Sequence, residues 1–141
     1  MGMIIQEVIE IDTGGRGAYE ITDAVVATAG RAGSGPGLCH LFVTHTSASL
    51  IICENADPQV LRDLDAYLNR LVPDGDRLFR HTAEGPDDMP AHVRSVLTQT
   101  HLTIPLRDGR LLLGTWQGIF LYEHRRRGHR RRVIVSLDAT P

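Results

Sequence analysis

The sequence predicts a single α+β domain with about three helices and a mainly antiparallel sheet, barrel-like or sandwich-like in form. Two long helical patterns lie between groups of short apolar runs, and tight turn signals join those runs. The chain has 141 residues, the length of one ordinary domain, and 42% of them are hydrophobic, which suffices for a core. No internal repeat or low-complexity linker divides it. We therefore expect one domain over residues 1–141.

The first part of the chain is predicted to form strands and one short helix. Residues 3–12 form an alternating run that predicts a strand, with isoleucines on one side. Thr22 is expected to cap a short helix that ends near residues 30–33. The inward side of this helix should carry Val25, Val26 and Ala29. Two β-type runs follow at residues 38–44 and 48–53, separated by the polar segment His45-Thr46-Ser47.

Two longer helices are predicted in the middle of the chain. Asp57-Pro58 is a strong helix start, and leucines then recur at 3, 4 and 3 residues before Pro73 ends the pattern. Asp88 is expected to cap a second helix with Pro90 in its first turn. The apolar face of that helix should contain Val93, Val96 and Leu97.

The C-terminal part changes to a period of two, which predicts strands. The short runs cover residues 102–106, 110–114, 118–123 and 132–137. Asp108-Gly109 between the first two is a dipeptide typical of a hairpin turn.

Composition excludes several classes of protein. We expect a soluble, cytoplasmic protein, because the first apolar positions are interrupted by charges and no run approaches the roughly 18 residues of a membrane helix. Cys39 and Cys53 lack the spacing of a metal or redox motif, which favours buried, reduced thiols. All fifteen basic residues are arginines, so a Walker-type phosphate loop and Schiff-base chemistry are excluded.

Six of the arginines fall within residues 125–132, centred on Gly128. Without them the net charge of −2 would be −8. No aromatic residue is interleaved, and the run lies between two apolar segments, as a hairpin turn would. This favours a solvated turn or a subunit contact. Nucleic-acid binding and steering of a phosphorylated substrate are the alternatives.

A polar loop before the last predicted helix carries the densest functional chemistry. Residues 80–92 contain two histidines and three carboxylates, with Gly85-Pro86 and Met89-Pro90 restricting the backbone. Three of the seven histidines stand in polar, turn-like settings: His45, His81 and His92. Three protein ligands are typical of a catalytic zinc site, so we expect these imidazoles to converge on a divalent metal, zinc or magnesium. Each could instead be an ordinary surface or cap residue.

The residues resemble a known family. The chain contains, in order, His45-Thr46-Ser47-Ala48, Glu54-Asn55-Ala56-Asp57-Pro58, Asp63-Leu64, Arg80-His81, Glu84-Gly85-Pro86-Asp87-Asp88-Met89-Pro90-Ala91-His92, Leu102-Thr103-Ile104-Pro105 and Leu113-Gly114-Thr115-Trp116-Gln117-Gly118. This series is similar to that of the YjbQ-like family, UPF0047, over nearly the whole chain. The departures are small: Cys53 stands where a small polar residue is more usual, and the arginine-rich turn is longer and more basic.

The resemblance implies a barrel-like α+β fold, a homotrimer and a secondary thiamine-phosphate synthase activity, which joins a pyrimidine diphosphate to a thiazole phosphate. It also implies a pocket whose catalytic side chains are Glu54, Asp63, Asp87 and Glu123 and whose ligand-binding side chains are Asn55 and Gln117, beside the three histidines. Phosphorylated substrates require basic donors, for which Arg80, the histidines and backbone amides after Asp88 are available. The established enzymes of this reaction are (β/α)₈ barrels of about 250 residues, so the activity would be convergent or incidental.

Two classes of function therefore remain open from the sequence. The first is an enzyme, either of the thiamine-phosphate synthase type or a metal-assisted hydrolase, acting on a small phosphorylated molecule. The second is a metal- or phosphate-binding module without turnover. The excess of carboxylates over those that a cation requires favours an enzyme. Glu123 shares the inward face of its predicted strand with Ile119 and Leu121, so it lies either at the floor of the pocket or, if the strand frays, at the surface beside an arginine.

Overall fold

The computed structural model describes residues 2–140. Its elements follow the order β1 (Met3–Asp12), β2 (Gly17–Glu20), α1 (Thr22–Ala29), β3 (Gly37–Val43), β4 (Ala48–Glu54), α2 (Pro58–Leu71), α3 (Asp88–Leu97), β5 (His101–Arg107), β6 (Arg110–Leu111), β7 (Gln117–Glu123) and β8 (Arg130–Ala139). No helix of these residues is long and apolar enough to cross a membrane.

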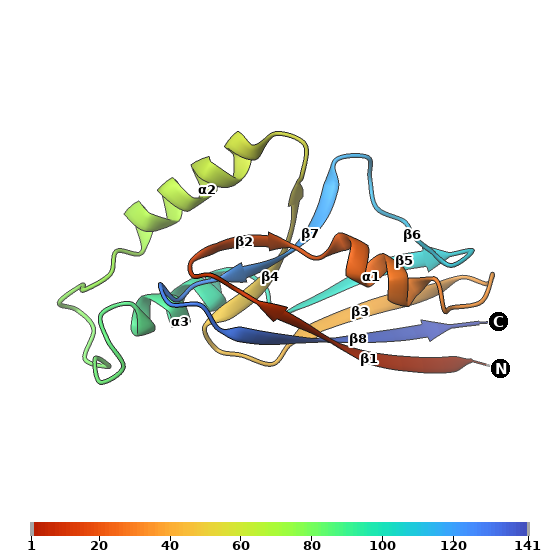
Figure 1. The fold of residues 1–141 in the computed structure, drawn as a ribbon, viewed down its shortest axis with the longest axis horizontal. Coiled ribbons are helices and arrows are strands. Elements are labelled where there is room, and N and C mark those ends of the chain that lie inside the picture. Colours follow the sequence, from red (N-terminus) through yellow and green to blue (C-terminus); the bar gives the residue numbers. More distant parts are fainter. Residues whose placement is uncertain (1, 141) are drawn as a thin grey trace.

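The strands form two antiparallel sheets that curl around one core. The larger sheet has the order β1-β8-β3-β5-β6 and the smaller one β2-β7-β4. A bridge between Leu50 and Gln99 links β4 to the segment before β5, so the sheets meet along one side (Figure 1). This arrangement confirms the predicted α+β class with a mainly antiparallel, barrel-like sheet and three helices.

The core lies inside the curl, where the two sheets face each other. Along β8, Val133, Val135 and Leu137 are fully buried and alternate with more exposed residues, as the period-two pattern predicted. They pack with buried side chains from the smaller sheet, including Leu50 and Leu121. Each such side chain stabilises the fold by roughly 1.5–3 kcal/mol relative to exposure.

The two cysteines are free thiols, as the sequence predicted. Cys39 is buried in the core, and this burial raises the pKa of its thiol to about 11. Cys53 is only partly buried.

Helix α1 begins one residue earlier than predicted. Thr22 is its first residue, and its hydroxyl donates to Glu20 and accepts from the backbone of Ile119, so it fastens the helix to β7 instead of capping it. Val25 is buried as expected, but Val26 is largely exposed. This eight-residue helix packs against β6, β7 and β8.

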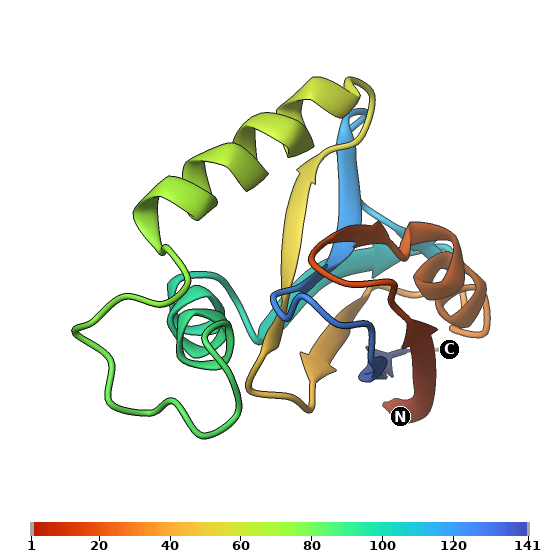
Figure 2. The ribbon, with the colours of Figure 1, turned by 60° about the vertical axis from the view of Figure 1, so that its left-hand side comes forward.

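Helix α2 confirms its predicted start. The Asp57 carboxylate accepts from the backbone N–H of Gln59, and Pro58 occupies the first helical position. The helix stands away from the sheets, and Figure 2 shows it as the most separate element. Of its recurring leucines, only Leu68 is buried, while Leu71 is mostly exposed.

Helix α3 departs from the predicted apolar face. Val96 and Leu97 are exposed, and the buried side includes Ala91, Arg94 and Ser95. Asp88 is the first helical residue and makes no capping hydrogen bond, because its carboxylate is directed to side chains instead. The predicted apolar face is wrong. The orientation of this helix follows from hydrogen bonds and ion pairs of Asp88 and Arg94 with other segments, more than from apolar packing.

The Asp108-Gly109 turn is confirmed. It joins β5 to β6 with φ values of 55° and 68°. Two successive positive φ values are those of a type I′ hairpin turn.

Candidate functional site

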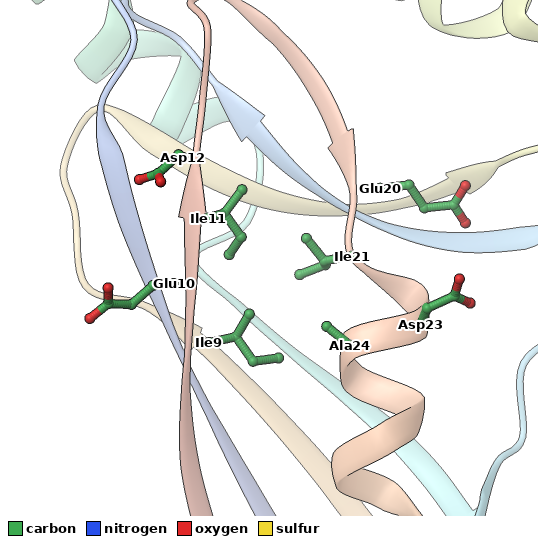
Figure 3. A pocket seen from close by; sticks show the side chains of 8 residues that line it. All are labelled: Ile9, Glu10, Ile11, Asp12, Glu20, Ile21, Asp23 and Ala24. Atoms are coloured by element: carbon green, nitrogen blue, oxygen red, sulfur yellow. The ribbon is translucent and has the colours of Figure 1, made fainter.

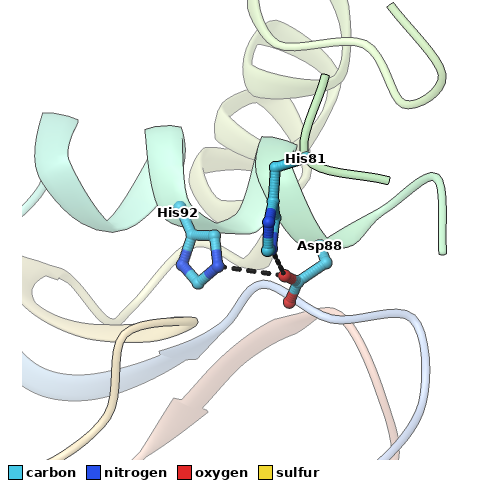
Figure 4. Close-up of side chains that lie close together, drawn as sticks. All are labelled: His81, Asp88 and His92. Carbon is cyan, nitrogen blue, oxygen red and sulfur yellow. Dashed lines mark hydrogen bonds and ion pairs between the residues drawn. The ribbon is translucent and has the colours of Figure 1, made fainter. Parts of the chain in front are cut away.

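Two imidazoles converge on one carboxylate at the start of α3. Nε2 of His81 lies 2.8 Å from Oδ2 of Asp88, and Nε2 of His92 lies 3.0 Å from the same oxygen (Figure 4). One ligand atom from each residue lies within 4.8 Å of the others. We call these three residues the His–Asp cluster.

The local backbone explains how the cluster forms. Asp88 and His92 are four residues apart on α3, so their side chains lie on the same side of the helix. His81 comes from the loop before the helix, and that loop turns back at Gly85, whose φ of 105° a residue with a side chain rarely adopts. The backbone of this loop thus holds a histidine over the helix start.

Neighbouring groups fix the orientation of two members. Arg125 donates from Nη1 to Oδ1 of Asp88 at 2.9 Å, which leaves Oδ2 to the histidines. Nδ1 of His92 lies 3.0 Å from the backbone oxygen of Thr46. A carbonyl oxygen only accepts hydrogen bonds, so Nδ1 of His92 carries a proton. Nε2 of the same ring faces the Asp88 carboxylate. That contact requires either a second N–H on the ring or a cation between the two atoms. Metal-binding histidines typically make this kind of bond to a carbonyl.

The electrostatics favour an ionised Asp88. Burial raises the pKa of this carboxyl, but the hydrogen bond from His81 and the charges of His92 and Arg125 outweigh it and lower the pKa below its usual value. The Asp88 side chain is only 3% exposed, whereas that of His81 is 48% exposed. The cluster therefore centres on a buried carboxylate, and solvent has access to it from the side of His81.

Asp87, predicted to be catalytic, lies next to the cluster but is already occupied by donors. Its carboxylate accepts from Nε of Arg125 and from the backbone N–H of Arg126. Burial opposes its charge, but these hydrogen bonds and the charge of Arg125 lower its pKa to about 2. A general base works best with a pKa near the working pH, so this geometry fits a structural carboxylate.

Within one chain, His45 does not join the His–Asp cluster. Its Nε2 accepts from the backbone N–H of Arg132 at 2.9 Å, and its Nδ1 lies 3.4 Å from Nη1 of Arg131. Burial and then the charge of Arg131 lower the pKa of this imidazole. Among residues 2–140 of a single chain, His81 and His92 meet with Asp88 as the third donor. The convergence of His45 with these histidines in an assembly stays a prediction.

Glu123 is fully buried, so the alternative of a frayed strand with a surface carboxylate is wrong. It accepts from Thr13 at 2.6 Å and forms a buried ion pair with Arg131. Arg131 in turn contacts Ser47 and His45. Glu123 therefore orients Arg131, which contacts residues 45–47. The Glu123 carboxylate is not accessible to solvent within the chain.

The other predicted residues do not lie in the cluster. Glu54 accepts from the backbone N–H of Asp57, and Asp63 accepts from Gln59 within α2. Asn55 donates to Glu20, and Gln117 accepts from the backbone N–H of Gly114 in the same turn. Arg80 is exposed beside His81. The end of β4 and the start of β7 bring together three of the predicted residues, Glu54, Asn55 and Gln117.

The structure adds residues that the sequence did not assign. The sequence pattern indicates a cap at Asp88, and it favours a solvated turn or a subunit contact at Arg125. The signal that could have found Asp88 is its spacing of four from His92, which places both on one side of a helix. No sequence signal could have found Arg125 or the carbonyl of Thr46, because each is distant in the chain.

The arginine-rich segment is a connection between sheets and not a hairpin. It runs from β7 in the smaller sheet to β8 in the larger one. Most of its arginines pair with carboxylates: Arg125 with Asp87 and Asp88, Arg126 with Asp74, Arg130 with Asp12, Arg131 with Glu123 and Arg132 with Glu10. Ion pairs within the chain therefore hold most of this segment.

A cavity of about 330 Å³ adjoins the cluster. Its lining combines polar loop residues with apolar ones: Gly75, Asp76, Arg77, Phe79, His81, Thr82, Gly85, Pro86, Met89 and Pro90. A small molecule in this space would contact His81 directly.

A second cavity, of about 570 Å³, lies between β1 and the start of α1. Figure 3 shows Ile9 and Ile11 facing Ile21 and Ala24, with the acids around them pointing outward. It contains no histidine, and Glu10 and Asp12 at its rim already pair with arginines. The cluster on α3 is therefore the stronger candidate site.

The fold and cluster together define a class: small α+β domains with a curled antiparallel sheet and a His–carboxylate group at the start of a helix. Comparison with known families gives the particular one. The profile described as UPF0047 protein YjbQ-like matches residues 7–139, and the chain belongs to this family.

Relatives and solved structures agree with this membership. A UPF0047 protein of Synechocystis is 54% identical over 94% of this chain and 90% of its own length. The UPF0047 protein YjbQ of Escherichia coli O157:H7 is 41% identical over 96% of this chain and 99% of its own. The crystal structure of a conserved hypothetical protein of Thermus thermophilus has 37% identity and a TM-score of 0.80, covering 91% of this chain and 97% of that one.

Proposed function

We propose that the His–Asp cluster is a divalent-metal centre and that the protein is an enzyme acting on a small phosphorylated molecule. The observation that carries this proposal is the meeting of two Nε2 atoms at one carboxylate oxygen, with the remaining atoms of His92 and Asp88 held by Thr46 and Arg125. Ligands fixed in this way need little rearrangement to bind a cation.

The donor set fits zinc better than magnesium. Two imidazole nitrogens and one carboxylate oxygen are typical of catalytic zinc and related transition-metal sites. Magnesium prefers oxygen ligands in an octahedral shell. Three protein ligands would also leave room for a water or substrate ligand, and the 48% exposure of the His81 side chain shows that solvent reaches this part of the cluster.

A metal bound in such a site supplies an acidified water and polarises a phosphoryl or carbonyl oxygen. The protein residues orient the ligands: Thr46 holds His92, and Arg125 holds Asp88. The charge of Arg125 also favours the ionised form of Asp88. Asp87 stays ionised and occupied, so it supports Arg125 and does not move a proton. His81 borders the adjoining cavity and would contact a bound substrate.

The reaction most in keeping with the resemblance is thiamine-phosphate synthesis, and metal-assisted hydrolysis is the second candidate. Arg77 and His81 at the cavity are the donors available to a phosphate there. The observation that favours phosphate handling in general is this cavity with Arg77 in its lining. A binding module without turnover would use the same ligands.

Metal content tests the centre directly. Elemental analysis of the purified protein should find about one zinc or similar transition metal per chain, and His92→Ala should lose it. His101→Ala is the matched control, because His101 is an exposed histidine on β5 and should leave the metal content unchanged. Wild-type protein that remains metal-free after zinc is added and excess removed would overturn the proposal.

Turnover separates an enzyme from a binding module. The zinc-loaded protein would be incubated with the pyrimidine diphosphate and thiazole phosphate pair, and separately with simple phosphate esters. We expect product in one of these assays and its loss in His92→Ala but not in His101→Ala. Full metal occupancy without product in either assay would favour the binding module.

A further inference from the structure

A second cluster of charged side chains lies outside the His–Asp cluster. A cavity of about 290 Å³ opens between the end of α2, helix α3 and the connection after β7. Its lining residues are Arg16, Asn69, Pro73, Asp74, Arg94 and Arg126. Three guanidinium groups and one carboxylate thus face the same space, which leaves two positive charges in excess.

The single carboxylate is shared by two of the arginines. Arg16 donates from Nη1 and Nη2 to the two oxygens of Asp74 at 3.0 Å each. Nη2 of Arg126 lies 2.6 Å from Oδ2 of Asp74. Asp74 is only 8% exposed at its side chain and is thus fully engaged by these two partners.

Arg94 has no such partner. It is 1% exposed, yet within residues 2–140 no carboxylate oxygen lies within 4.0 Å of its nitrogens. Its Nη2 donates to Asn69 and to the backbone oxygen of Val72, and its Nε has no hydrogen-bond partner. The charges of Asp74 and Asp65 act on Arg94 only from beyond ion-pair distance. Burying a guanidinium without a carboxylate in contact is costly, so this arrangement favours binding of an anion in the adjoining cavity.

We propose that this basic cavity binds a phosphate dianion, either as free phosphate or as the phosphate group of a small monoester. Two excess positive charges match a dianion, and the planar fork of donors on a guanidinium matches phosphate oxygens. A space of about 290 Å³ admits a phosphate group with a few further atoms. The anion would give Arg94 a counter-charge in direct contact, in addition to the more distant charges of Asp74 and Asp65.

This site is separate from the metal centre in its residues, although the two are neighbours in the chain. Arg125 reaches Asp87 and Asp88, while the next residue, Arg126, reaches Asp74. The proposal needs no metal, so it is tested on protein treated with a chelator and then dialysed. Its failure would therefore leave the metal proposal standing, and the reverse also holds.

Calorimetric titration of inorganic phosphate into the full chain is the test. We expect saturable binding at one site per chain, weakened roughly tenfold or more in Arg126→Gln through loss of a charge-assisted hydrogen bond. The Arg126 side chain is 63% exposed, so this variant should fold as the wild type does. Arg132→Gln is the matched control, since that side chain is 60% exposed and pairs with Glu10 away from the cavity.

Two outcomes overturn the proposal: no saturable heat with the wild type, or an equal loss in the Arg132→Gln control. Arg94→Gln gives a second readout, because it should abolish binding if it remains folded by circular dichroism. Parallel titrations with phenyl phosphate identify the source of the anion. Tighter binding of phenyl phosphate assigns the cavity to organic monoesters, and tighter binding of inorganic phosphate assigns it to the free ion.

Discussion

At the scale of single residues, buried carboxylates and their arginine partners determine how the candidate sites are held. Glu123 has 0% exposure and accepts from Arg131, Thr13 and the backbone N–H of Arg125. Burial raises the pKa of this carboxyl, but the hydrogen bonds from Arg131 and Thr13 outweigh burial and lower the pKa below 4.5. The carboxylate is thus ionised, and it positions Arg131 against Ser47 and His45.

Replacing Glu123 by Gln should therefore cost stability. The change leaves the Arg131 guanidinium buried without its counter-ion, and breaking one side of a buried pair costs roughly 3–5 kcal/mol in the free energy of unfolding. Urea denaturation at neutral pH measures it. Glu10→Gln is the control, because Glu10 pairs with Arg132 at the surface, where such a pair contributes about 0–1 kcal/mol.

The stability that the Glu123–Arg131 ion pair contributes should depend on pH. Because the folded-state pKa of Glu123 is lowered, its contribution is present above the ordinary value of 4.5 and is lost as the pH falls through the folded-state pKa. The difference in stability between wild type and Glu123→Gln should shrink over that range. A difference that stays constant with pH would show that the lost stability comes from packing and not from charge.

At the scale of elements, the local signals predict α2 correctly and α3 only in part. Asp57 and Pro58 act within one turn of chain, so their effect does not depend on distant residues. Asp88 has the sequence context of a similar cap, but its carboxylate is drawn to His81, His92 and Arg125. The exposed side chain of Val96 and the buried one of Arg94 likewise reverse the apolar pattern of that helix.

Removing the cap of α2 should have a small, measurable cost. Asp57→Ala deletes the acceptor for the backbone N–H of Gln59 and should destabilise the protein by roughly 1 kcal/mol. Asp63→Ala removes the same charge from the middle of the same helix and should change stability by much less. Thermal unfolding of the two variants side by side decides whether the hydrogen bond or the charge matters.

At the scale of the whole molecule, exposed apolar side chains point to assembly. We propose a homotrimer, as the resemblance implies. The sequence suggests residues 111–113 with 119–121 as the surface between subunits, but Ile119, Phe120 and Leu121 are buried within one chain. The large exposed hydrophobic side chains are instead on other elements and include Ile4, Phe42, Leu78, Val96 and Trp116.

Sedimentation equilibrium at micromolar protein tests the assembly. The mass should be about three times the 15.6 kDa of the chain, because a cyclic trimer would cover these side chains and the helix faces that the single chain leaves open. A measured mass close to that of one chain would overturn the proposed trimer. The same trimer could bring His45 of one chain toward the cluster of another, which keeps their predicted convergence testable in the assembled protein.

The sequence by itself determined the α+β class, most strand positions, the start of α2 and the hairpin at Asp108-Gly109. Each depends on periodicity or on contacts within a few residues, which the order of side chains alone specifies. It also marked His81 and His92 as functional candidates. Only the tertiary structure decided which carboxylate their rings contact, the position of His45 within one chain, the burial of Glu123 and the pairing of the arginine-rich segment. Those outcomes depend on contacts between residues far apart in the chain, and the curl of two sheets brings such residues together in a way that local pattern does not encode.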